Sequence, residues 1–138
     1  YLHYADLALA RETENLKTLT QGLKAKDPVM RYWSVVGLLL LEKGAKSAIP
    51  ALKNALDDQD EIPPLAAWAI YKAGDKAFAE KWMLETITND PGNKMLANVL
   101  DWMGKGSFSI LARIPRSKLP KKGLLKDVVN RAEARKKG

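Results

Sequence analysis

Three groups of residues have side chains that could do chemistry, but none has the spacing that such chemistry needs. Asp57-Asp58-Gln59-Asp60-Glu61 is rich in oxygen ligands, yet a helix–loop–helix calcium site requires alternating ligands, a central Gly and a distal Glu. Gly104-Lys105-Gly106-Ser107 lacks the first glycine of a phosphate loop, because Val99 stands there. His3 is the only histidine and there is no cysteine. The sequence therefore predicts no catalytic, cofactor-binding or metal-ligating residue, and it predicts a solvated turn at 57–61.

The net charge of +7 is concentrated at the end of the chain. Residues 1–112 carry 13 Lys and Arg against 14 Asp and Glu, whereas residues 113–138 carry ten against two. We expect Arg113, Arg116, Lys121 and Lys122 to be candidate interface residues. Three interpretations stay open: a solvated terminal helix whose cations complement its dipole, docking onto an acidic partner domain or a sulfated polyanion, and nucleic-acid binding. The near-neutral body disfavours nucleic acid, because the basic residues of such proteins line the inner face of the repeats.

Composition places the chain among globular proteins of about one domain. It has 138 residues, 46% of them hydrophobic and 28% charged. The longest uninterrupted apolar run, Leu38–Leu41, is far shorter than the roughly 20 residues of a membrane-spanning helix. No membrane span is expected.

The elements repeat along the chain with a fixed period. Gly44, Gly74 and Gly104 lie thirty residues apart, and each follows a stretch with the apolar spacing of an amphipathic helix. A period of this size is typical of helix pairs that stack, because one pair alone cannot bury its apolar face. The sequence predicts an all-α fold in which the three glycines end successive helix pairs.

The clearest predicted helix begins at Pro28, with Asp27 as N-cap, and runs to about Lys43. Trp33 lies in its main apolar stripe, so we expect Trp33 in the core of the central helix. Asp90-Pro91 has the same form as Asp27-Pro28 and predicts another helix start.

Four tryptophans fall within predicted helices, and packing in the core or between repeats is the default expectation for most of them. They are Trp33, Trp68, Trp82 and Trp102. Trp68, together with Tyr32 or Tyr71, is instead a candidate for a half-exposed interface.

Residues 45–74, AKSAIPALKNALDDQDEIPPLAAWAIYKAG, resemble the HEAT repeat family in its short bacterial form. The resemblance covers roughly residues 13–104 and implies an α-α superhelix, a HEAT-like solenoid of about three helix pairs with irregular caps. In that family an Arg at the position of Arg31 commonly pairs with turn carboxylates. Pro64 stands at or next to the matching position of the following repeat, so a ladder of such pairs is interrupted. On this basis we divide the chain into a HEAT-like domain (1–112) and a basic C-terminal capping segment with a terminal helix (113–138).

A narrower resemblance lies in Asp27-Pro28-Val29-Met30-Arg31-Tyr32-Trp33-Ser34-Val35-Val36-Gly37-Leu38. This stretch is similar to one in the helical tails that follow the catalytic domain of many bacterial sulfatases. The resemblance implies a non-catalytic accessory domain that braces the catalytic domain or shapes access to its substrate cleft, in a periplasmic or secreted enzyme. The nucleophile motif Cys/Ser-x-Pro-x-Arg and the calcium ligands of that family belong to the catalytic domain and do not occur here, so no catalytic residue is carried over.

Two other functions remain open. The first alternative is a stand-alone HEAT-like scaffold that binds another protein, and the second is a nucleic-acid-binding helical repeat. The residues expected to be structural in every case are Asp27, Arg31, Trp33, Gly44, Gly74 and Gly104.

Overall fold

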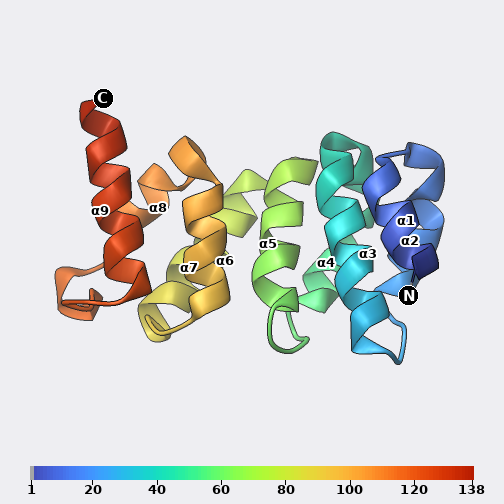
Figure 1. The fold of residues 1–138 in the computed structure, drawn as a ribbon, viewed down its shortest axis with the longest axis horizontal. Helices are drawn as coiled ribbons and strands as arrows, with labels where there is room; N and C mark the ends of the chain where they lie inside the picture. The colour runs from blue at the N-terminus through green and yellow to red at the C-terminus, as the bar shows by residue number, and fades with distance from the viewer. Residues whose placement is uncertain (1) are drawn as a thin grey trace. The chain divides into compact units, whose positions relative to one another are not determined.

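The computed structural model describes residues 2–138, with side chains from His3 onward (Figure 1). The described chain contains helices and no strand, which confirms the all-α prediction. The α-helices are α1 (Leu2–Ala10), α2 (Leu16–Gly22), α3 (Pro28–Leu41), α4 (Ile49–Ala55), α5 (Ile62–Ala73), α6 (Lys76–Asn89), α7 (Lys94–Trp102), α8 (Phe108–Ala112) and α9 (Leu124–Lys137). Short 3₁₀ helices connect several of them: η1 (Thr13–Asn15), η2 (Glu42–Ala48), η3 (Gly104–Ser107) and η4 (Arg116–Lys118).

The chain divides into two compact units. The first ends at Ala79 and the second begins at Glu80, so that the division falls inside α6. The division expected after residue 112 is of another kind, between repeats and a basic cap, and it stays a prediction.

In the first unit, α1, α3 and α5 form a row of neighbouring helices, with α2 and α4 packed against it (Figure 1). Helix α3 contacts α1, α2 and α5 and is therefore central in the first unit, as predicted, but the expectation that it is also the most buried helix is wrong. Helix α5 is buried more thoroughly than α3: Leu65, Ala66, Ala67, Ala69 and Ile70 are all inaccessible or nearly so. Its alanines allow the neighbouring helices to approach closely.

Small residues determine how closely α2 and α3 approach each other and α1. A Cβ added at Gly37 would lie 2.8 Å from both Leu19 methyl carbons and 2.9 Å from the Ala8 Cα. A Cβ at Gly22 would lie 2.0 Å from the Ser34 Oγ. Ser34 is fully buried, and its hydroxyl donates to the Met30 carbonyl over 2.8 Å. These positions have no room for a larger side chain.

The predicted end of α3 at Gly44 is wrong. The helix ends at Leu41, and Glu42 takes up the positive φ of 52° at which the chain leaves the helix. Gly44 lies inside η2 and has no positive φ. The lack of a side chain at Gly44 instead avoids a close contact, because a Cβ there would lie 3.0 Å from the Thr13 Cγ2.

The other two periodic glycines behave as expected. Gly74 has a φ of 125° directly after α5, and its N–H donates to the Ile70 and Tyr71 carbonyls. Gly104 has a φ of 59° just beyond α7. Both take a backbone conformation that L side chains rarely adopt.

The predicted helix start at Asp90-Pro91 is wrong, because that stretch forms a turn. The Asn93 N–H donates to the Asp90 carbonyl, and α7 begins three residues later than Pro91, at Lys94. The Asn93 side chain is the N-cap and accepts from the Leu96 N–H over 2.9 Å. Asn93, which lies closer to the helix, therefore replaces Asp90 as the N-cap.

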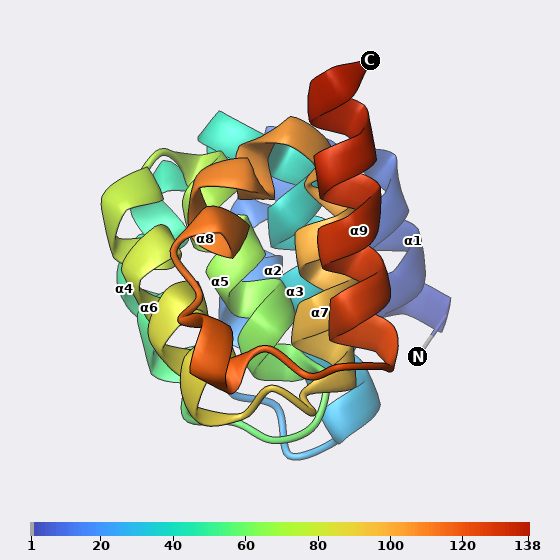
Figure 2. The same ribbon diagram turned by 90° about the vertical axis from the view of Figure 1, so that its left-hand side faces the viewer.

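In the second unit, α9 runs beside α7 (Figure 2). Leu125, Val128 and Ala132 are buried on its inner face. The predicted terminal helix is thus present, and it contributes to the core of this unit.

Candidate functional site

The sequence motif that begins at Asp27 joins two loops of the first unit. Asp27 caps α3, since its Oδ1 accepts from the Val29 N–H over 2.8 Å. One turn later, the Arg31 guanidinium turns back to the preceding loop, where Nη1 donates to the carbonyls of Ala25 and Lys26 over 2.8 and 2.9 Å. The same guanidinium donates to Asp58 from Nε over 2.7 Å and from Nη2 over 3.3 Å. The pairing of Arg31 with a turn carboxylate is confirmed.

The rest of the acidic run around Asp58 has no metal-site geometry. Asp58 is committed to Arg31 and to its own following N–H, and Asp60 adopts a φ of 57° in the turn before α5. Among the residues with described side chains, no group of three or more His, Cys, Asp and Glu could hold a metal ion.

The expectation that Trp33 lies in the core is wrong. The buried face of α3 consists of Ser34, Val35, Gly37, Leu38, Leu39 and Leu41. Trp33 is half-buried and packs edge-on against Tyr32, with ring centroids 5.4 Å apart and planes at 80°. Almost every position of α3 is apolar, so periodicity alone does not choose the face. The small residues Ser34 and Gly37 are the signal that could have identified it.

The remaining aromatic candidates differ in exposure. Trp68, Trp82 and Tyr71 are half-buried, which suits the interface expectation for Trp68 and Tyr71. Trp102 is 54% exposed at the end of α7, which is consistent with an expectation of packing for most, and not all, of the tryptophans.

Part of the positive charge of the C-terminal segment is used within the second unit. Arg113 donates to Glu80 over 3.2 Å and to the Ser109 carbonyl over 3.1 Å. Arg131 donates to Asp101 from Nε over 3.1 Å and from Nη2 over 3.2 Å, and this hydrogen bond raises the pKa of the Arg131 guanidinium. The candidate Arg113 is therefore a structural residue that ties α8 to α6.

Three cations of the C-terminal segment, Arg116, Lys121 and Lys126, line a cavity of about 500 Å³, which we call the C-terminal cleft. Its other polar lining residues are Asn130 and Glu133, and its apolar lining residues include Leu111, Ile114, Leu119 and Val129. Within the described part of the chain, Arg116, Lys121 and Lys126 form no ion pair. Three cations and one carboxylate beside apolar side chains suit an anionic partner with an apolar contact.

Three further residues singled out from the sequence line other cavities. Lys122 lines a separate cavity of about 280 Å³ with Lys94, Pro120 and Leu124. Tyr71 and Gly44 line a third cavity, in the first unit. Within the second unit, the structure thus brings Arg116 and Lys121 to one cavity, whereas Lys122 lines another and Arg113 pairs with Glu80. Lys126 is not among the predicted interface residues, because the sequence attributes its charge to a solvated terminal helix.

No helix in the described chain combines the length and the apolar character that crossing a bilayer requires. No protein-family model, curated protein or solved structure matches this chain, so the family resemblances rest on the sequence motifs alone.

Proposed function

We propose that this chain is a non-catalytic helical-repeat accessory domain that docks onto an acidic surface of a partner through the C-terminal cleft. The observation that carries the proposal is one cavity lined by three cations without an ion pair in the described chain, Arg116, Lys121 and Lys126, and by apolar side chains. Charges at the rim of an interface mainly steer association and select the partner, while apolar contacts at its centre supply affinity.

The finer architecture that we infer is an α-α superhelix of the HEAT-like kind. Its support is the row of α1, α3 and α5 with α2 and α4 packed against it in the first unit. The Arg31–Asp58 pair also supports this architecture, because it links the loop before α3 to the loop after α4. Repeats of this kind stabilise one another through their neighbours.

The partner that we propose is the catalytic domain of a bacterial sulfatase-like hydrolase, with this chain as its C-terminal extension. The support is the stretch from Asp27 to Leu38. Its most distinctive polar residues both have structural roles: Asp27 caps α3, and Arg31 links the loop before α3 to the loop after α4. Such a role explains why these residue types occur together without any catalytic group.

The coding sequence upstream of Tyr1 tests the sulfatase assignment. We expect several hundred preceding residues with a Cys/Ser-x-Pro-x-Arg motif and clustered Asp and Asn. An immediate start codon, or only further helical repeats, would overturn it. The chain would then be a stand-alone scaffold that uses the same cleft for another protein.

A further inference from the structure

A charged cavity also lies in the first unit, in a region for which the sequence predicts no basic binding site. It lies where α3 ends and η2 begins, beside the last turn of α5 and the first residue of α6, and its volume is about 380 Å³. The charged residues that line it are Glu42, Lys43, Lys72 and Lys76. We call this cavity the lysine pocket.

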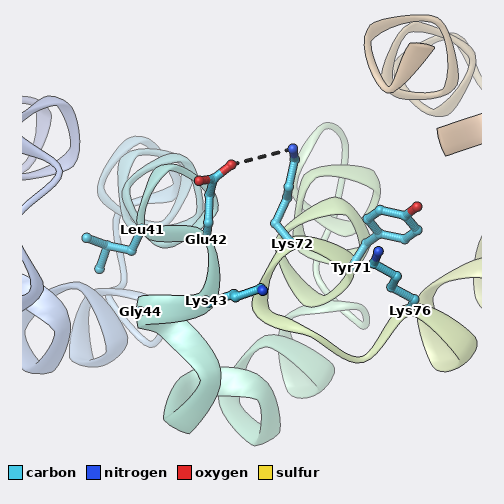
Figure 3. A pocket seen from close by; sticks show the side chains of 7 residues that line it. All are labelled: Leu41, Glu42, Lys43, Gly44, Tyr71, Lys72 and Lys76. Atoms are coloured by element: carbon cyan, nitrogen blue, oxygen red, sulfur yellow. Dashed lines mark ion pairs between the residues drawn. The ribbon is translucent and has the colours of Figure 1, made fainter. Parts of the chain in front are cut away.

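The lysines of this pocket outnumber its carboxylates. Glu42 pairs with Lys72, whose Nζ lies 3.5 Å from Oε1. In the described chain neither Lys43 nor Lys76 lies within ion-pair distance of a carboxylate, and the ammonium of Lys76 instead lies 5.4 Å from the centre of the Tyr71 ring. In Figure 3, Glu42 and Lys72 face each other at one end, Tyr71 and Lys76 lie together at the other, and Lys43 extends between them from the α3 side.

Two features of the pocket are locally unfavourable. Glu42 has φ 52° and ψ −121°, a conformation that an L residue rarely adopts. Lys76 is the first residue of the fourteen-residue helix α6, at the end where the helix dipole disfavours a cation. Features that local preferences disfavour persist where the surrounding structure or a function requires them. Both of these unfavourable features occur in the lysine pocket, and both belong to charged residues that line it.

We propose that the lysine pocket binds a small molecule carrying a phosphate monoester. Three lysines and one carboxylate line the pocket, and this excess of positive charge favours a compact dianion; a phosphate monoester carries close to two negative charges at neutral pH. Lysine is an effective phosphate ligand because its ammonium acts as a mobile point charge with three donors. The volume is within the usual range for a small-molecule site.

Glu42 competes with the ligand for Lys72. The Glu42 side chain is 61% exposed, so the ion pair can open when a stronger anion arrives. Removal of the Glu42 charge therefore strengthens binding, whereas removal of the Lys43 or Lys76 charge weakens it. A variant that merely disturbs the fold produces loss of binding only.

Isothermal titration of the full chain with glucose 6-phosphate tests the proposal, with glucose 6-sulfate as the matched monoanion. We expect saturable binding with one site. Lys43→Gln and Lys76→Gln each weaken it about ten-fold, which is the scale of one charge-assisted hydrogen bond. Glu42→Gln strengthens it about three-fold, the scale of releasing one exposed ion pair. The matched control Lys46→Gln, an exposed lysine of η2 that does not line the pocket, leaves it unchanged.

Three results would overturn the proposal. The first is no saturable binding up to about 10 mM, a concentration that still reports millimolar affinity. The second is an equal loss in Lys46→Gln, which would show non-specific attraction to surface charge. The third is equal affinity for glucose 6-sulfate, which would show that a dianion is not required.

Discussion

Arg31 Nε donates to Asp58 Oδ2 over 2.7 Å, which joins the loop before α3 to the loop after α4. The two side chains are only 22% and 16% exposed, and the same guanidinium also satisfies two carbonyls of its own loop. A planar guanidinium with five donors can make all four of these hydrogen bonds at once, whereas the ammonium of lysine has only three donors.

Arg31→Ala should lower the free energy of unfolding by about 2–3 kcal/mol, because it leaves a half-buried carboxylate and two carbonyls without their donor. Urea denaturation measures the change. A double-mutant cycle with Asp58→Ala isolates the pair, and we expect a coupling above about 1 kcal/mol. Lys53→Gln is the control, since the more exposed Lys53–Asp75 pair should be worth less than about 1 kcal/mol. A coupling near zero would show that the loops are held together by other contacts.

Gly37→Ala should destabilise the first unit by roughly 1–3 kcal/mol, the usual range for overpacking. The added Cβ would meet the Leu19 methyls and the backbone of Ala8, and the backbone cannot move aside. Gly92→Ala is the matched control, because its Cβ would approach only Asp90 Oδ1, at 3.7 Å. Thermal unfolding of the two variants measures the difference. Equal melting temperatures would contradict the close packing of α1, α2 and α3.

Leu38→Ala should cost more than Trp33→Ala, although tryptophan is the larger side chain. Leu38 is fully buried, and truncation of a buried leucine costs roughly 2–5 kcal/mol. Trp33 keeps part of its ring in water and loses less on truncation. Denaturant midpoints of the two variants provide the comparison. A larger loss for Trp33→Ala would place the ring, and not Leu38, on the buried face of α3.

Glu42→Gly should stabilise the protein by about 1 kcal/mol, because glycine adopts φ 52° without the strain that a side chain adds. The lost ion pair with Lys72 is exposed and is worth at most about 1 kcal/mol. Glu42→Ala separates the two effects, since it removes the ion pair and retains the strain. If both variants have the same stability, the backbone at this position is not strained.

Local sequence patterns predicted some features of the fold correctly and missed others. Local patterns were reliable when one residue had one candidate partner: Asp27 caps α3, and Gly74 ends α5 with a positive φ. They failed when neighbours competed. Asn93 displaced Asp90 as cap, and Glu42 displaced Gly44 as the residue that leaves the helix.

The candidate site shows the same limit. Charge counting located the basic segment, and the structure brings Arg116 and Lys121 to one cleft. It did not reveal that Arg113 and Arg131 are bound to Glu80 and Asp101, because those carboxylates lie about thirty residues away in the sequence. Which cations are free depends on tertiary contacts, and periodicity does not encode these contacts.

Removal of residues 113–138 should loosen the second unit and leave the first intact. Helix α9 buries Leu125, Val128 and Ala132, so truncation exposes the apolar face of α7 that it covers. Hydrogen exchange should show faster exchange of α7 amides while α3 amides stay protected. A deletion of Lys136, Lys137 and Gly138 alone is the control and should change neither. Unchanged exchange in α7 after the full truncation would show that the segment is a dispensable cap.

The most direct test of the docking proposal is a binding titration between this chain and the protein domain encoded immediately upstream of it. The account predicts association that weakens as salt is raised. It also predicts that the variant Arg116→Glu/Lys121→Glu/Lys126→Glu loses this association while retaining its helical circular dichroism. Association of equal strength in the wild type and in this variant, or no association of the wild type at low salt, would contradict a docking role for the C-terminal cleft.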